Sequence, residues 1–212
     1  MSTAHSWSTR RSYNSAMARR VDKSARRAEI LRAGDRLLRD RGLQALQIRE
    51  VAREAGVAAG TVYTYFATKE SLFAALYAEQ ILRTVEEFKP YLDSPPREQF
   101  IRFATSYRDM YGVFGREVDV ASFVTPESLV DGRTVEELLS ATSQLVELMT
   151  EFIAKHDVPQ PELTLTILWS LLSGLAMHYS GPRQMFGASD WDEAVGFAAD
   201  KLVDILLPST KQ

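Results

Sequence analysis

The sequence predicts an all-α protein in which a small N-terminal three-helix head precedes a larger C-terminal helical body. The fold class is predicted from the spacing of apolar residues and from the positions of Gly and Pro, and the division into head and body from the distribution of charge. Apolar residues recur at spacings of three and four over most of the chain, and Gly or Pro stands at the ends of the periodic segments. The first 69 residues carry 14 Lys and Arg against 6 Asp and Glu, whereas the rest carries 11 against 22. The head is therefore basic (+8) and the body acidic (−11).

The composition of the 212 residues argues against several classes of protein. There is no Cys, so disulfides, thiolate metal sites and Cys nucleophiles are excluded. The three His residues show no metal-ligand spacing, and no common catalytic motif occurs, so we expect neither a metal, a cofactor nor an enzyme. No apolar run approaches the ~20 residues that span a bilayer, and the polar N-terminus does not resemble a signal peptide. We expect a cytoplasmic protein that does not enter the membrane.

Residues 1–23 are rich in Ser, Thr, Ala and Arg and show little apolar periodicity, so we predict a disordered basic arm. Such an arm either follows an anionic partner or is a solvated tail. Met17 offers an alternative start of translation. A first helix is expected over residues 24–41, where Gly42 ends it. Its apolar face consists of Ile30, Leu31, Gly34, Leu37 and Leu38.

Residues 47–69, QIREVAREAGVAAGTVYTYFATK, predict two short helices over 48–55 and 58–65. Gly56 lies between them, where a sharp turn requires a residue that tolerates positive φ. The inward positions are Val51, Ala52, Ala55, Val57, Val62 and Phe66. This spacing is typical of a helix-turn-helix, whose second helix enters the DNA major groove. The alternative is an ordinary hairpin of two helices.

The run from Arg27 to Leu76, with AGVAAGTVYTYFATKESLFAAL at its centre, resembles the DNA-binding domain of TetR-family (tetracycline-repressor-like) transcriptional regulators. The resemblance covers roughly a quarter of the chain. It implies a DNA-binding domain over residues 24–69 and an effector-binding and dimerisation domain over residues 70–212. The expected function is repression of transcription, relieved when a small-molecule effector binds. The alternatives are a DNA-binding activator without small-molecule control and a helical sensor or partner-binding protein.

The outward face of the second short helix supplies most of the predicted DNA contacts. Gly60 lets the backbone approach the bases, and Thr61 offers both a methyl and a hydroxyl group. The resemblance implies base or phosphate contacts for Thr61 and Tyr63 and phosphate contacts for Tyr65 and Lys69. Tyr65 has core packing as its alternative. The full predicted set is Arg49, Ala59, Gly60, Thr61, Tyr63, Thr64, Tyr65 and Lys69.

Three further positions bear on this motif. Arg49 falls where some family members place a guanine-contacting arginine, with a phosphate contact or a solvated side chain as alternatives. Family members usually carry Thr or Ser at the positions of Gln47 and Ala58, so both short helices are expected to lack a side-chain cap. A missing cap costs on the order of 1 kcal/mol.

The rest of the chain predicts five helices, over 69–88, 97–114, 134–156, 162–180 and 192–207, with Thr68 as the N-cap of the first. In the helix over 134–156, Leu139 and Val146 are expected inside with the other apolar residues. The segment 162–180 is apolar on two faces, which indicates burial against its own core and against a second subunit. We therefore predict a homodimer through residues 162–180 and 192–207.

The resemblance also implies an effector pocket within the body. Its apolar candidates lie on the aromatic helix over 97–114 and the apolar segment 162–180. The candidates for contact with a polar group of the ligand are His178, Arg108 and the Tyr hydroxyls. The alternative for most of them is simple core packing. The candidate effector-binding residues are Phe103, Tyr107, Tyr111, Trp169 and His178. The DNA partner is expected to be a palindromic double-stranded operator, since a twofold dimer has two equivalent heads.

Overall fold

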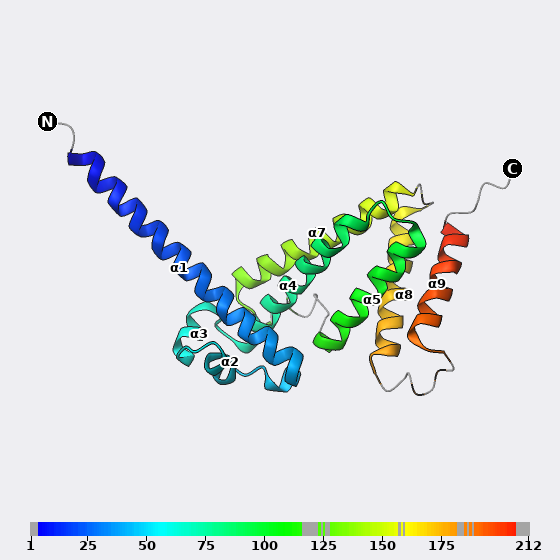
Figure 1. Cartoon of the computed structure of the whole chain (residues 1–212), viewed down its shortest axis with the longest axis horizontal. Coiled ribbons are helices and arrows are strands. Elements are labelled where there is room, and N and C mark those ends of the chain that lie inside the picture. The colour runs from blue at the N-terminus through cyan, green and yellow to red at the C-terminus, as the bar shows by residue number, and fades with distance from the viewer. Residues whose placement is uncertain are drawn as a thin grey trace. The chain divides into compact units, whose positions relative to one another are not determined.

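A computed structural model confirms the all-α fold class (Figure 1). It describes residues 4–115, 128–156, 160–181 and 189–206, together with residues 123, 125, 158, 185 and 187. For residues 4–22 and 204–206 only the backbone is described. The chain divides into two compact units, Met1–Phe73 and Ala74–Gln212. None of the helices, over the residues described, is long and apolar enough to cross a membrane.

The first unit contains the long helix α1 (Ala4–Arg41), a single 3-10 turn η1 (Leu43–Ala45) and two short helices, α2 (Ile48–Glu54) and α3 (Ala59–Tyr65). Helix α1 corrects the prediction of a disordered arm over residues 1–23, because its backbone is helical from Ala4. That segment contains neither Gly nor Pro, so nothing in it ends a helix, even though it lacks an apolar face.

The core of this unit lies where α1 packs on α2 and α2 packs on α3. Its members are apolar side chains that expose at most 7 % of their surface: Ile30, Leu31, Leu37, Leu38, Leu46, Ile48, Val51, Ala52, Val62 and Phe66. The guanidinium of Arg27 lies 5.0 Å from the centre of the Phe66 ring, which covers this core with a cation–π contact. Arg36 on α1 donates to Glu54 on α2 at 3.0 Å.

The turn between α2 and α3 is a Schellman motif. The N–H of Val57 donates to the carbonyl of Ala52 at 2.9 Å, and the N–H of Gly56 donates to the carbonyl of Arg53 at 3.2 Å. Gly56 has φ +66°, the left-handed conformation that this motif requires and that Gly adopts without strain. The predicted turn chemistry is therefore present, and it sets the direction in which α3 leaves α2.

Helix α4 (Lys69–Phe88) runs through the boundary between the units. The described part of the second unit continues with the 3-10 turn η2 (Lys89–Tyr91) and the helices α5 (Pro96–Phe114), α7 (Gly132–Lys155), α8 (Pro161–Tyr179) and α9 (Trp191–Leu206). These helices agree with the predicted ones to within about two residues at each end. Pro or Gly stands at or near the start of α5, α7 and α8, where sequence predicts breaks.

The second unit is built around α5 and α8, which pack on each other, with α9 on both and α7 on α8 (Figure 1). Aromatic side chains fill much of its core: Phe88 lies edge-on to Phe103 at 5.4 Å, and Tyr77 packs on Phe114 at 5.3 Å. Leu139 and Val146 of α7 are 45 % exposed, so their predicted burial is wrong. The buried stripe of α7 instead follows Leu138, Ala141, Leu145 and Leu148/Met149, about a quarter turn away.

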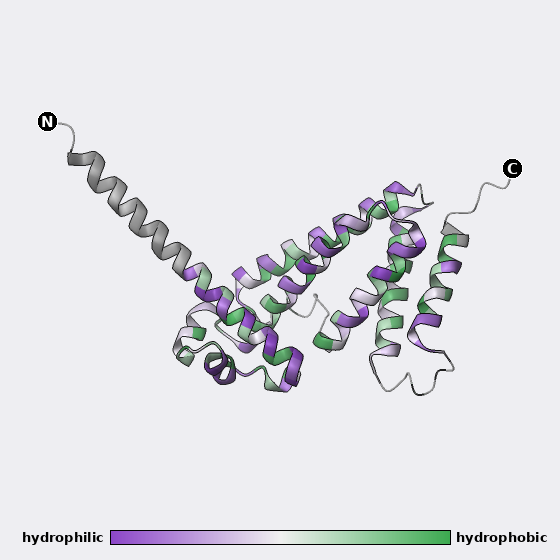
Figure 2. Ribbon diagram, viewed as in Figure 1, coloured by the Kyte–Doolittle hydropathy of each residue, from purple (hydrophilic) through white to green (hydrophobic). Residues whose placement is uncertain are grey.

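The described part of the chain covers only one face of α8. Thr164, Leu168, Leu172 and Ala176 are buried, whereas Leu163 and Ile167 are each 59 % exposed. Phe197 of α9 is likewise 67 % exposed. Figure 2 shows hydrophobic residues along the length of α8. Some of them, such as Leu163 and Ile167, lie on its exposed face.

Candidate DNA-binding interface and ligand sites

The outward face of α3 is available for contact with a large partner. Gly60, Tyr63 and Thr64 are exposed, and Tyr63 exposes 55 % of its surface although it is aromatic. Apart from the two flanking residues and the backbone of α3 itself, no atom of the described residues lies within 4 Å of the position that a Cβ of Gly60 would take, so the backbone there is accessible. The remaining predicted contacts, at Ala59, Thr61, Tyr65 and Lys69, are half-buried. All eight predicted residues, Arg49 included, belong to the first unit.

Some polar groups on or near this face already have a partner within the protein, whereas Arg49 has none among the described carboxylates. The hydroxyl of Thr64 donates to the carbonyl of Gly60 at 3.0 Å, so its proton is used within the helix and only its lone pairs remain. On α2, Arg53 is paired with Glu50. Arg49, by contrast, is exposed and has no carboxylate partner among the described residues.

The two short helices lack side-chain caps at their N-termini, as the sequence predicts. Neither Gln47, before α2, nor Ala58, before α3, makes a side-chain cap, although the carbonyl of Ala58 accepts from the N–H of Thr61 at 2.9 Å. The predicted cap of α4 is confirmed, since the hydroxyl oxygen of Thr68 accepts from the N–H of Ser71 at 3.0 Å. Lys69 is the first residue of α4, so its ammonium group is carried next to this capped helix start.

In the body, the cavities formed by the described residues do not gather the five candidate effector residues around one space. Phe103 lines a small apolar cavity. Tyr107 and Trp169 pack edge to face at 5.5 Å, and the hydroxyl of Tyr107 lies 3.2 Å from that of Ser173. Burial raises the pKa of the Tyr107 phenol, so it remains a neutral hydroxyl at physiological pH. His178 packs edge to face on Tyr179 at 4.8 Å, and Tyr111 is half-buried.

Two small cavities lie inside the second unit and share part of their lining. Their volumes are about 20 and 30 Å³, which is room for a single water each. Three side chains line both: Phe100, Phe152 and Leu168. The inner cavity is further lined by Phe88, Gln99, Phe103, Met149 and Leu172, and the outer one by Pro96, Ile153, His156, Val158, Thr164, Ala199, Leu202 and Val203.

His156, at the outer cavity, is a neutral imidazole over most of the physiological range. Burial and the nearby charge of Lys155 lower its pKa below 6.5. Its Nε2 is buried without a hydrogen-bond partner, and its ring packs on Phe152 at 5.1 Å.

This histidine should make the folded protein less stable in mild acid. Below pH 6.5 the unfolded chain binds a proton at His156 more readily than the folded one, so the free energy of unfolding falls as pH decreases through that window. Urea unfolding between pH 5 and 8 should show a shallower pH dependence for His156→Gln than for the wild type. Superimposable profiles would show that His156 titrates as it does in the unfolded chain.

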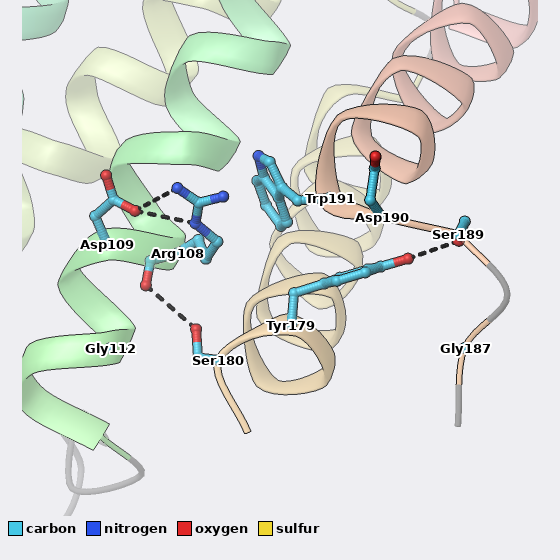
Figure 3. Close-up of a pocket in the computed structure, with 9 residues that line it drawn as sticks. All are labelled: Arg108, Asp109, Gly112, Tyr179, Ser180, Gly187, Ser189, Asp190 and Trp191. Atoms are coloured by element: carbon cyan, nitrogen blue, oxygen red, sulfur yellow. Dashed lines mark hydrogen bonds and ion pairs between the residues drawn. The ribbon is translucent and has the colours of Figure 1, made fainter. Parts of the chain in front are cut away.

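A larger, open cleft of about 690 Å³ lies at the junction of α5, α8 and α9 (Figure 3). Arg108 lies between the carboxylate of Asp109, at 2.7 Å, and the ring of Trp191, whose centre is 4.5 Å from the guanidinium carbon. Tyr179 packs edge to face on Trp191 at 5.6 Å, and its hydroxyl lies 2.9 Å from that of Ser189. The volume suits a small ligand. Several of its prominent polar groups are paired with one another.

Sequence reasoning did not select Gln99 or Trp191. Gln99 is fully buried on α5, and a signal for it was present, since it lies four residues before Phe103 on the buried face of that helix. Trp191 had no such signal, because its partners Arg108 and Tyr179 lie on two other helices, α5 and α8, and meet it only in the fold.

Comparisons with known proteins agree with this architecture. The family described as "Bacterial regulatory proteins, tetR family" matches residues 30–76. The HTH-type transcriptional regulator PksA of Bacillus subtilis is 22 % identical over 76 % of this chain and 82 % of its own. The HTH-type transcriptional repressor KstR2 of Rhodococcus jostii is 39 % identical over 61 residues, which are 29 % of this chain and 28 % of its own.

Solved structures share the fold. A TetR transcriptional regulator from Rhodococcus sp. RHA1 superposes with a TM-score of 0.60 at 23 % identity, covering 90 % of this chain and all of its own. The regulator FadR from Bacillus subtilis, in complex with stearoyl-CoA, gives a TM-score of 0.56 at 15 % identity, covering 83 % and 96 %.

A helix-turn-helix unit joined by a continuous helix to a separate helical unit defines a class of DNA-binding transcriptional regulators. Within that class, residues 30–76 match the family of bacterial regulatory proteins named after tetR, and the chain is similar to regulators of this family over most of its length.

Proposed function

We propose that this protein is a homodimeric repressor that a small molecule releases from a palindromic operator. The observation that carries the proposal is the exposed face of α3, held by a Schellman turn on a basic unit. Two relatives support this proposal. KstR2 is named a repressor, which favours repression over activation, and FadR was solved with stearoyl-CoA, which favours control by a small molecule.

In this proposal α3 enters the major groove. The Ala59 and Thr61 methyl groups contact thymine methyls, and the hydroxyls of Tyr63 and Thr64 lie against bases or phosphates. Tyr65 and Lys69 contact the flanking phosphates, where Lys69 contributes a charge that releases counterions from DNA. Arg49 contacts a guanine, for which its exposed guanidinium has no competing carboxylate among the described residues.

Arg49 and Lys69 should respond differently to alanine substitution. Arg49→Ala should weaken operator binding by roughly 10- to 100-fold and leave random DNA nearly unaffected, since a bidentate Arg–guanine pair is worth about 1–3 kcal/mol. Lys69→Ala should weaken both DNAs alike and reduce the slope of log affinity against log salt by about 1. Fluorescence anisotropy at several salt concentrations measures both effects. Equal losses on operator and random DNA for Arg49→Ala would exclude the guanine contact.

The dimer is proposed to form through the exposed apolar faces of α8 and α9, which include Leu163, Ile167 and Phe197. The half-buried Leu171 and the exposed Gly174 continue this face of α8 and allow close approach of a partner helix. Binding of such a dimer to a palindromic operator requires its two recognition helices to lie about 34–36 Å apart on DNA.

Ile167→Glu should convert the dimer to a monomer at micromolar concentration, because a carboxylate would have to enter an apolar interface. Val146→Glu is the matched control: Val146 is also an exposed aliphatic residue, at 45 %, but it lies on α7 outside the proposed interface. Sedimentation velocity compares the two. A monomeric wild type, or a dimeric Ile167→Glu variant, would refute this interface.

The effector is proposed to act by a shift of population. A ligand that binds the body more tightly when the heads have another separation lowers the fraction of DNA-competent dimer, and only to the extent of that difference in affinity.

A further inference from the structure

The feature that carries the inference is the side-chain amide of Gln99, which exposes none of its surface. Its nitrogen donates to the carbonyl of Leu92 at 3.0 Å and to the carbonyl of Ser94, both in the segment before α5. Carbonyl oxygens only accept, so the nitrogen must be the atom that faces them. The amide oxygen of Gln99 therefore lies on the other side, where it has no hydrogen-bond partner.

This unpaired oxygen belongs to a residue that lines the inner apolar cavity. The other described residues of the lining are aromatic or aliphatic, apart from the thioether of Met149, so none offers an N–H or O–H from its side chain. An unpaired buried acceptor is costly, and a molecule that brings its own hydrogen-bond donor would remove that cost.

The inner and outer cavities are parted by the side chains of Phe100, Phe152 and Leu168. Rotation of these side chains would join the two spaces into one narrow apolar channel between α5, α7 and α8. The channel would begin beside the neutral His156 and end at Gln99.

We propose that the effector is a neutral, slender, largely apolar molecule whose buried end donates a hydroxyl or N–H hydrogen bond to the amide oxygen of Gln99. This inference rests on the proposed small-molecule control of the protein. An ionised carboxylate would not serve, because it only accepts hydrogen bonds and would oppose the Gln99 oxygen. It would also place a charge in an apolar lining that holds no cation among the described residues.

The open cleft beside Trp191 is less suited to this role. Arg108 is paired with Asp109, and the hydroxyl of Tyr179 with that of Ser189, so a ligand there would have to displace existing contacts. The Gln99 oxygen, by contrast, is fully buried and has no hydrogen-bond partner, and its residue lines the inner cavity.

Three chain-matched probes test the proposal on the purified full-length protein: 1-decanol, its methyl ether 1-methoxydecane, and decanoate at pH 8. The alcohol donates, the ether accepts only, and decanoate accepts and is charged. Titration followed by tryptophan fluorescence should show 1-decanol binding roughly 10-fold or more tightly than the ether, with decanoate weaker still. This comparison needs no variant of the protein.

Gln99→Met then removes the acceptor with little change of volume, so the alcohol and the ether should bind equally. Gln144→Met is the control, since the Gln144 amide donates to Ser140 in its own helix and lines neither cavity. It should keep the preference for the alcohol. Should Gln99→Met fail to fold, the comparison of probes on the wild type still decides.

Equal binding of the three probes, tighter binding of decanoate, or no binding of any of them would overturn the inference; a single water would then be the partner of Gln99. Sequence-specific DNA binding is measured separately, without any probe. Its presence alongside a failed probe test would leave the proposed function in place, whereas its absence would count against that function itself.

Discussion

Val62→Asp should abolish specific DNA binding, with a loss of affinity of roughly 100-fold or more. Val62 exposes none of its surface and lies on the inward face of α3, in a core that also includes Val51, Ala52 and Phe66. An unpaired carboxylate in such a core costs about 3–5 kcal/mol, which is enough to detach α3 from α2. The second unit has its own core, so most of the helical circular dichroism should remain.

Tyr63→Asp is the matched control for that variant. It adds the same charge one residue later, at a position that is 55 % exposed. We expect it to weaken DNA binding by repulsion from phosphate while the amides of α2 and α3 keep their protection against hydrogen exchange. In Val62→Asp the same amides should exchange rapidly. Wild-type DNA affinity in Val62→Asp would mean that DNA is bound elsewhere on the chain.

Trp191→Ala should lower the free energy of unfolding by about 3–5 kcal/mol, in the range for truncation of a large buried aromatic side chain. The indole packs on Tyr179 and on the Arg108 guanidinium, and its N–H donates to the hydroxyl of Thr105 at 3.3 Å. One side chain thus connects the start of α9 with α5 and with the end of α8 (Figure 3).

Graded variants separate these contributions. Trp191→Phe retains an aromatic ring but loses the hydrogen bond to Thr105, so it should fall between the wild type and Trp191→Ala. Asp192→Ala, at the exposed next position of α9, should change the free energy of unfolding by less than about 1 kcal/mol. Urea unfolding at one protein concentration compares all four proteins. A Trp191→Ala value within 1 kcal/mol of the wild type would contradict the packing described at this junction.

The helix-turn-helix was predictable because its determinants are local. The Schellman turn needs one Gly at the right position, and the inward residues of α2 and α3 lie within a window of 16 residues around Gly56. The helix ends of the body were predictable for the same reason, from Pro and Gly. The start of α1 was not, because a segment without either residue and without an apolar face leaves disorder and helix undecided by pattern alone.

The body was harder to predict because its site depends on contacts between distant segments. Periodicity places Leu139 and Val146 on α7, but it does not say which of two neighbouring apolar stripes meets α8. The contact between Arg108 and Trp191 joins α5 to the start of α9, which lies far away in the sequence. The unpaired oxygen of Gln99 depends on where the carbonyls of Leu92 and Ser94 point, which only the folded turn determines.

The most direct test of the account is binding of the purified protein to DNA flanking the gene that encodes it, titrated against salt and against random-sequence competitor. The account predicts saturable binding that survives excess competitor, with a footprint whose two halves are related by a twofold axis. Binding that disappears with competitor and depends on salt alone would leave only electrostatic attraction to the basic head. That result would contradict sequence-specific regulation by this protein.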